Sequence, residues 1–325
     1  MIGLRCVVLC CVGLLSVSLA LGSSWFKLEL EGLKTMLERF LKIQELWSPS
    51  GCIMAMSTLC RPSKPSRLPS QQRRAVEAES SRSSSFDSNA DTLGFTAYPP
   101  AYLSPQASGK KLLLGANFAS AGSGYDDKTA FLSHAIPLSQ QLEYYKEYQA
   151  KLAKVAGNEK ARSIIKDGLY ILSAGNSDFL QNYYVNPFLY KVYTPYQYSS
   201  YIVSIFSSFV KRLYNLGARR IGVTSFPPLG CVPLAITLFG MHESGCVSRI
   251  NTDAQSFNKM INSSATNLQK QLPGLKIVVF DIYKSLHDLV KTPSNYGFAE
   301  ARRGCCGTGI IETTWLLCNP KSIGT

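Results

Sequence analysis

Short apolar segments alternate with amphipathic segments of helical length from Leu93 onward, and turn residues separate them. Apolar residues at helical spacing predict helices over residues 138–157, 196–217, 248–271 and 282–291. The apolar runs at residues 111–114, 168–175, 219–226 and 276–281 are predicted to be strands, and Pro227 ends the third of them. This alternation implies parallel strands joined by helical crossovers, and therefore a parallel sheet with helices on both faces.

Three polar segments, rich in glycine or proline, come directly after predicted strands, at residues 115–124, 173–179 and 225–233. In open parallel sheets, ligands bind beyond the carboxyl ends of the strands, where such loops gather. Each segment taken alone also fits an ordinary tight turn. Because all three are expected at the same edge, that edge is the predicted binding region.

The sequence contains, in this order, LGFTAYPPAYLSPQASGKKLLLGANFASAGSGY, LYILSAGNSDFLQNYYVNP, GARRIGVTSFPPLGCVP and ARRGCCGTGIIETTWLLCN. In order and spacing these segments resemble the plant GDSL esterase/lipases of the SGNH hydrolase superfamily, and the resemblance covers residues 91–325. It implies a three-layer α/β/α flavodoxin-like fold around a parallel sheet. It also implies hydrolysis of carboxylic esters through an acyl-serine intermediate, without a cofactor.

In that family, a glycine N–H of the second block and the asparagine of a GxND motif stabilise the oxyanion. By the resemblance, Gly122 supplies the first donor. The GxND position reads Gly175-Asn176-Ser177-Asp178, so Ser177 occupies the asparagine site, and Asn176 is an alternative donor if the loop shifts. A serine hydroxyl donates one hydrogen bond from a shorter side chain, and losing such a donor typically costs about 3 kcal/mol of transition-state stabilisation.

The family's GDS block, which carries the nucleophilic serine, and its DxxH block, which carries the aspartate and histidine, are not found in their expected form. The segment Phe86–Asp91 echoes the first block and makes Ser88 a candidate nucleophile, but it follows no predicted strand. The histidines also lack the family's spacing to an aspartate, and surface or packing roles are favoured for His134, His242 and His287. We therefore expect a domain that is incomplete at both ends and catalytically impaired.

Residues 1–20 are predicted to be a secretory signal peptide, with basic Arg5 before an apolar run. An uncleaved membrane anchor would need a longer apolar stretch. Residues 21–90 hold one short amphipathic helix and a Ser/Pro/Arg-rich stretch that is predicted to be disordered. Asn262 begins an Asn-Ser-Ser sequon and is a candidate glycosylation site, which agrees with a secreted, extracellular protein of the cell wall or apoplast.

Cleavage after Ala20 would leave an odd number of cysteines. In an oxidising compartment, this implies a free thiol or a partner outside the chain. Cys231 and Cys246 are a candidate disulfide, whereas the three cysteines nearest the C-terminus cannot all pair with one another. No CxxC, HExxH or clustered carboxylates occur in the sequence, so no metal site is predicted.

The formal net charge is +13, but the basic residues are scattered between apolar segments. They do not form the clustered stripe that is typical of nucleic-acid binding. A solvated basic face is favoured over adhesion to an acidic wall polymer. Beyond the N-terminal leader, no segment is apolar for long enough to span a bilayer. By the resemblance, the partner is a small ester or acyl compound or a cell-wall substrate.

Two other functions stay open. One is a secreted, non-catalytic binding protein that keeps an acyl- or polymer-binding groove. The other is that the sequence is a mis-spliced or mispredicted form of an active esterase. The abrupt change in composition near residue 90 and the stop inside a family motif favour the latter.

Overall fold

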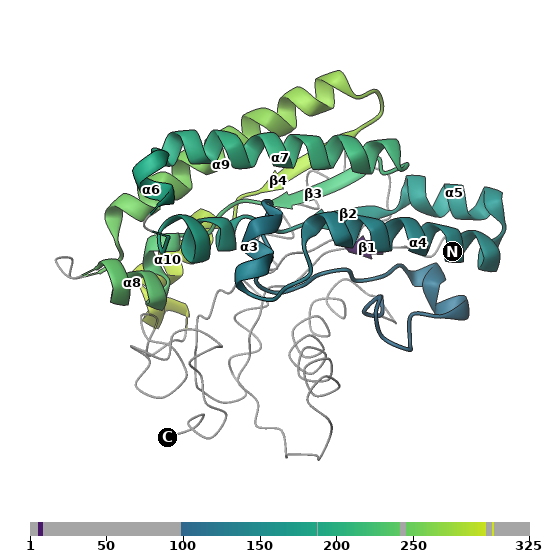
Figure 1. The fold of residues 1–325 in the computed structure, drawn as a ribbon, viewed down its shortest axis with the longest axis horizontal. Helices are drawn as coiled ribbons and strands as arrows, with labels where there is room; N and C mark the ends of the chain where they lie inside the picture. The colour runs from purple at the N-terminus through teal and green to yellow at the C-terminus, as the bar shows by residue number, and fades with distance from the viewer. Residues whose placement is uncertain (1–5, 9–98, 187, 241–244, 297–300, 302–325) are drawn as a thin grey trace, which may run out of the picture. The chain divides into compact units, whose positions relative to one another are not determined.

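The computed structural model describes residues 6–8, 99–186, 188–240, 245–296 and 301 (Figure 1). Several sequence predictions lie outside these residues: the segment 21–90, Ser88, His242, most of the predicted signal peptide and the three cysteines nearest the C-terminus. In the described part, a small parallel sheet is packed among helices.

The sheet has the strand order β1-β2-β3-β4, and every neighbouring pair is parallel. The strands are β1 Cys6–Val8, β2 Leu169–Leu172, β3 Arg220–Thr224 and β4 Lys276–Phe280. The register pairs Leu169 with Arg220, and Arg220 with Lys276. Because these are the first residues of β2, β3 and β4, these strands begin at one edge of the sheet and end at the opposite edge.

The central strands have no solvent-facing side. Every residue of β2 is buried, and so are the three middle residues of β3. Burial on both faces explains why these strands are continuous apolar runs rather than alternating ones. The predicted α/β fold, with layers covering both faces of a parallel sheet, is confirmed.

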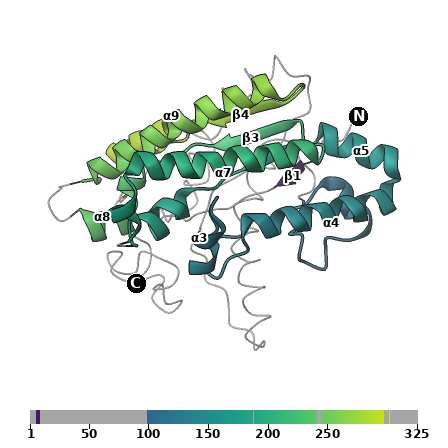
Figure 2. The same ribbon diagram turned by 45° about the horizontal axis from the view of Figure 1, so that its top comes forward.

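The α-helices in chain order are α3 Asp127–Leu132, α4 Leu138–Ala156, α5 Asn158–Asp167, α6 Leu189–Val192, α7 Pro195–Asn215, α8 Pro233–Phe239, α9 Ser248–Gln271 and α10 Tyr283–Lys291. A π-helix, η2, spans Asp178–Tyr183, and short 3-10 helices are η1 Gly109–Leu114, η3 Leu229–Cys231 and η4 Pro293–Tyr296. Among these, α4, α7 and α9 lie side by side (Figure 2). Glu143 of α4 approaches Arg212 of α7 at 4.0 Å, and the Ser207 and Ser264 hydroxyls join α7 to α9 at 2.7 Å.

Helix α7 shows how local sequence starts an element that tertiary packing then stabilises. The Thr194 hydroxyl accepts a hydrogen bond from the Gln197 N–H at 3.2 Å, and the Gln197 amide oxygen accepts one from the Thr194 N–H at 2.9 Å. Pro195 occupies the first helical position. This is a capping box. The buried face recurs every three or four residues, at Tyr198, Ile202, Phe206, Phe209, Val210 and Leu213.

Two local features differ from the sequence prediction. Residues 109–114 form η1, so the strand predicted over residues 111–114 is wrong. Only Leu112 is buried there, and its carbonyl accepts a hydrogen bond from the Tyr148 hydroxyl at 2.9 Å. Helix α5 was not predicted; it follows Gly157, whose φ of 78° separates it from α4.

Strand β1 lies within the predicted signal peptide, and it is an outermost strand of the sheet that pairs with β2. This pairing does not test cleavage, so the signal peptide stays a prediction. None of the described helices is long and apolar enough to cross a membrane.

The chain divides into two compact units. The first contains the sheet and the described residues of Ala97–Leu229 and Thr252–Tyr283. The second contains those of Gly230–Asn251 and the residues from Lys284 onward. The predicted binding edge belongs to the first unit, apart from the last part of the segment 225–233.

Phe206→Ala is expected to lower the free energy of unfolding by about 3–5 kcal/mol, since the buried ring leaves a cavity. The Phe206 ring is fully buried and meets Tyr125 edge-on at 5.7 Å between centroids. The matched control is Phe131→Ala on α3, whose side chain is 68% exposed and should change stability by less than about 0.5 kcal/mol. Urea unfolding of both variants measures the difference. Equal losses would contradict the assigned core.

Candidate functional site

The predicted site residues lie on two loops of the first unit. One loop, residues 115–126, precedes α3. The other, residues 173–177, leaves the carboxyl end of β2 and enters η2. We call them the Gly122 loop and the Ser177 loop. Single-turn π-helices occur often at functional sites, because the extra residue redirects side chains.

Gly122 has a φ of 86°, and a Cβ added there would lie 2.6 Å from the Cβ of Ser133. Both the backbone conformation and the space therefore require glycine. The Ser133 hydroxyl in turn donates to the Gln181 amide oxygen at 2.6 Å, which joins this region to η2. The predicted N–H donor thus sits in a fixed turn.

The Gly122 loop is also held from within. The Ser123 hydroxyl donates to the Ser120 carbonyl at 2.7 Å, and the Gln141 amide donates to the Ser123 hydroxyl at 3.1 Å. The Ser120 hydroxyl accepts a hydrogen bond from the Ile136 N–H at 3.0 Å. Because buried loop backbone needs such partners, this network makes one conformation strongly preferred.

Asp178 connects the two loops. Its fully buried carboxylate accepts hydrogen bonds from the Tyr125 N–H at 2.7 Å, the Asp126 N–H at 3.2 Å and the Thr129 hydroxyl at 2.6 Å. The carboxylate lies so close to Gly124 that a Cβ there would collide with it. From the sequence, Asp178 was only the last residue of the altered GxND position, and no role was predicted for it.

Burial raises the pKa of Asp178 to about 7, and the nearby Asp126 carboxylate adds to that rise. The three donors act in the opposite direction, because they favour the charged carboxylate. The folded pKa is thus above the ordinary value of 3.8. The folded protein binds the proton more tightly than the unfolded chain does, so this group stabilises the fold at low pH and progressively less as the pH rises toward 7.

Ser177 is only 2% exposed, and its Oγ has no hydrogen-bond partner among the described residues. Asn176, the alternative donor, is also buried. An unpaired buried hydroxyl typically costs about 1–3 kcal/mol relative to a paired one. Such groups are few in native proteins, and a catalytic role or a bound water or ion is among the reasons for keeping one.

Aromatic rings support the Ser177 loop. Gly175 has a φ of 104°, and a Cβ there would lie 2.5 Å from the Phe226 ring. Phe226 stacks on Phe257 with 3.8 Å between ring centroids, and Phe179 meets both rings edge-on. Asn258 holds the Phe226 backbone, accepting from its N–H at 2.6 Å and donating to its carbonyl at 2.9 Å. The loops after β2 and β3 are therefore packed together.

The described histidines have the environments of surface and packing residues. His134 is exposed directly after α3, with a φ of 49°. His287 lies half-buried on α10 in the second unit, where burial and then Lys291 lower its pKa. Within the described residues, no group of three or more His, Cys, Asp or Glu side chains could hold a metal ion.

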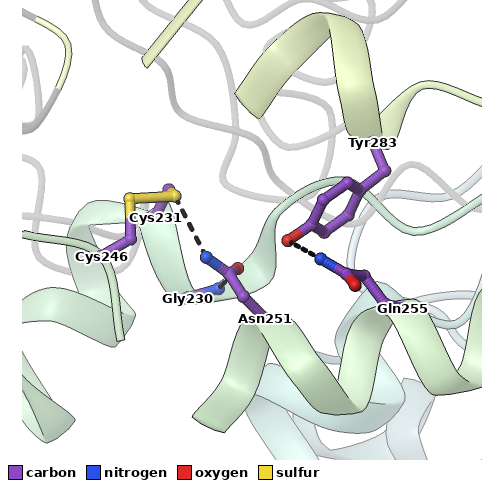
Figure 3. Close-up of a disulfide and its surroundings, with 6 residues drawn as sticks. All are labelled: Gly230, Cys231, Cys246, Asn251, Gln255 and Tyr283. Atoms are coloured by element: carbon purple, nitrogen blue, oxygen red, sulfur yellow. Dashed lines mark hydrogen bonds between the residues drawn. A yellow bond between two sulfur atoms is a disulfide. The ribbon is translucent and has the colours of Figure 1, made fainter. Parts of the chain in front are cut away.

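The second unit contains a disulfide between Cys231 and Cys246, the pair for which the sequence suggested one (Figure 3). The Asn251 side chain lies beside it, accepting from the Gly230 N–H at 2.8 Å and donating to the Cys231 sulfur at 3.4 Å. The Val247 N–H donates to the Gly230 carbonyl at 2.7 Å. These contacts fix the start of α9.

Asp178→Asn is expected to lower the free energy of unfolding by about 2 kcal/mol or more, since an amide NH₂ would face a backbone N–H donor. It should also remove the fall in stability between about pH 4 and pH 7 that the raised pKa of Asp178 causes in the wild type. Denaturant unfolding across that range measures both effects. Asp281→Asn is the control, because in the part of the chain that the structure describes this exposed carboxylate accepts only from the Tyr283 N–H, and an asparagine oxygen can replace it. If the unfolding free energy of the Asp178 variant fell with pH as steeply as that of the wild type, the raised pKa would not belong to Asp178.

Comparison with known proteins agrees with the resemblance in the sequence. Residues 81–312 match the family described as GDSL-like Lipase/Acylhydrolase. The chain is 68% identical to the GDSL esterase/lipase APG of Arabidopsis thaliana over 239 residues, which is 74% of this chain and 68% of that protein. Two further Arabidopsis thaliana GDSL esterase/lipases are 56% and 55% identical, each over 74% of this chain and over 67% and 68% of their own lengths. The chain therefore belongs to the GDSL-like lipase/acylhydrolase family.

Proposed function

We propose that this chain binds carboxylic esters between the Gly122 loop and the Ser177 loop, with the Gly122 N–H and the Ser177 hydroxyl donating to the ester carbonyl oxygen. The observation that carries the proposal is the buried Ser177 Oγ without a partner among the described residues. A carbonyl oxygen is an acceptor, which is what this donor lacks. Family membership supports the same chemistry.

The arrangement suits a developing negative charge better than a neutral carbonyl. Donors that are already fixed in place need no reorganisation when an oxyanion forms, and a dry surrounding strengthens them. The Asp178 hydrogen bonds and the glycine-only turn at Gly122 supply that fixation. Asn176 is the alternative second donor, and it would need a different loop conformation.

Turnover by these 325 residues is proposed to be weak. Acyl transfer also requires a nucleophile and an oriented base. Neither the GDS block nor the DxxH block is recognisable in the sequence. Ser88 is the one serine whose neighbouring residues partly match the family's nucleophile block. Oxyanion stabilisation and binding alone accelerate such reactions about a thousandfold over water. The alternative is a binding protein without catalysis, or a variant form of an active esterase.

The proposed location is outside the cell. The leader-like residues 1–20 support secretion, and so does the sequon at Asn262. The Asn262 side chain is exposed on α9, so an attached glycan would point into solvent.

Ser177→Ala is expected to leave the free energy of unfolding unchanged or to raise it by about 1 kcal/mol, because it removes an unsatisfied hydroxyl. Calorimetric titration with ethyl butyrate should show binding weakened by about twofold to tenfold, which is the loss of one neutral hydrogen bond. The matched control is Ser225→Ala. The Ser225 hydroxyl is buried and accepts from the Ile282 N–H at 3.0 Å, so this variant should lose stability instead.

The hydrolysis of p-nitrophenyl butyrate by wild type and by Ser88→Ala tests the catalytic part. Wild type and Ser88→Ala should hydrolyse the ester at equal rates. Both rates should stay close to the acceleration of about a thousandfold over water that oxyanion stabilisation and binding alone provide. Saturable turnover that Ser88→Ala abolishes would identify a nucleophile and contradict weak catalysis. Unchanged ester binding in Ser177→Ala would contradict the proposed donor.

A further inference from the structure

The first unit carries a concentration of positive charge at the edge of the sheet where the strands begin. Helix α5 ends just before β2, α7 ends just before β3, and α9 ends just before β4. Since the first residues of these strands are in register, the three helix ends come together at one edge, where α5 lies in Figure 1. The Gly122 and Ser177 loops belong to the opposite edge.

Contacts between these elements confirm that the helix ends are neighbours. The Arg220 guanidinium donates to the Asp167 carbonyl at 2.7 Å, and the Tyr214 hydroxyl donates to the Pro273 carbonyl at 2.9 Å. Gly217, between α7 and β3, packs against Ile165 of α5. We call the cationic side chains gathered here the basic edge: Lys151, Lys154, Lys160, Arg162, Lys166, Lys211, Arg212, Arg219, Arg220, Lys270 and Lys276.

Part of the basic edge is neutralised locally. Arg212 approaches Glu143 at 4.0 Å, and Arg220 approaches Asp167 at 3.6 Å. Arg219 stacks on the Tyr214 ring at 3.9 Å from its centroid. The remaining charge is exposed, and no carboxylate among the described residues forms an ion pair with Lys154, Lys160, Arg162, Lys166, Lys211 or Lys270.

Helix stability does not account for all of these cations. Lysine and arginine in the last turn of a helix stabilise its macrodipole, which fits Lys166 in α5 and Lys270 in α9. Lys160 and Arg162 lie in the first half of α5, where the dipole disfavours positive charge. Charge at those positions points to a use outside the helix.

The form of the basic edge fits a linear polyanion. A small anion is usually held by convergent, buried donors, whereas most of these side chains are exposed and spread over the ends of α4, α7 and α9 and along α5. A lipid surface would need apolar anchors as well as charge. Among the exposed large apolar side chains of the first unit, only Val155 belongs to the segments of the basic edge, while most others lie on α3, α6 and the start of α7.

Single-stranded nucleic acid is disfavoured for a related reason. Its readers combine cations with exposed aromatic rings on which bases stack. The exposed rings among the described residues of the first unit lie on α3, on or next to α6 and in the first part of α7: Phe131, Phe188, Tyr190, Tyr193, Tyr196 and Tyr201. Tyr214, the ring at the basic edge, is already covered by Arg219.

We propose that the basic edge binds an acidic polysaccharide, a linear polymer whose repeated carboxylates meet the unpaired cations of α5, α7 and α9. Such binding holds the chain by the edge opposite the Gly122 and Ser177 loops and leaves those loops open to esters. The fold itself creates this surface, since its cations are scattered in the sequence.

The test measures binding of the full chain to polygalacturonate at low and at physiological ionic strength. Wild type should bind, and salt should weaken the binding. The triple variant K160E/R162E/K166E should bind about 100-fold or more weakly, because each cation near an anionic surface contributes about fivefold in affinity. The double variant K211E/K270E, with its changes on α7 and α9, should lose at least about tenfold in affinity. It tests the proposal even if the triple variant does not fold.

The matched control is K128E/K191E/K259E, which makes the same change in net charge at exposed lysines outside the basic edge. Its affinity for polygalacturonate should fall by less than about threefold, because salt screens charges that lie more than a Debye length from the bound polymer. Equal losses in both triple variants would show that only net charge matters and would overturn the proposal. So would absence of wild-type binding, or tighter binding to phosphatidylserine vesicles or to single-stranded DNA than to polygalacturonate.

Discussion

The Asp178 carboxylate is enclosed by protein, and it accepts hydrogen bonds from two backbone N–H groups and one hydroxyl of the segment 125–129. A buried charge is tolerated only with such donors, so the carboxylate and the segment that supplies them depend on one another. This interaction ties the Gly122 loop to the end of β2. Glycine at 124 lets the Gly122 loop approach the Asp178 carboxylate, and glycine at 175 lets the Ser177 loop lie against the Phe226 ring, which stacks on Phe257.

The parts of the fold that depend on local periodicity could be predicted from the sequence. Helix α9 begins and ends where its amphipathic spacing predicts, and β2 is the buried run that precedes the GNSD motif. The run at residues 111–114 misled the prediction, because three adjacent leucines fit a strand and a helical turn equally well. Position within the motifs made Ser177 and Gly122 candidates, and their proposed roles stay predictions. The role of Asp178 could not be seen, since its Tyr125 partner is 53 residues away in the chain.

The two edges of the sheet have different chemistry for a topological reason. Helix ends with their lysines return to the edge where strands begin, and the glycine-rich and serine-rich loops follow the edge where strands end. Charge that looks diffuse along the sequence is therefore concentrated in space. By the same topology, the proposed ester-binding loops and the proposed polysaccharide-binding surface lie at opposite edges of the sheet.

An NMR titration of the ¹⁵N-labelled chain would show whether an ester carbonyl binds between the Gly122 and Ser177 loops, as proposed. A long-chain methyl ketone serves as ligand, because it presents a carbonyl oxygen that cannot be hydrolysed. We expect the largest chemical-shift changes at the Gly122 and Ser177 amides, and we expect both to saturate at the same ligand concentration. Saturating changes confined to other parts of the chain, such as α6 and the start of α7, would contradict the proposal.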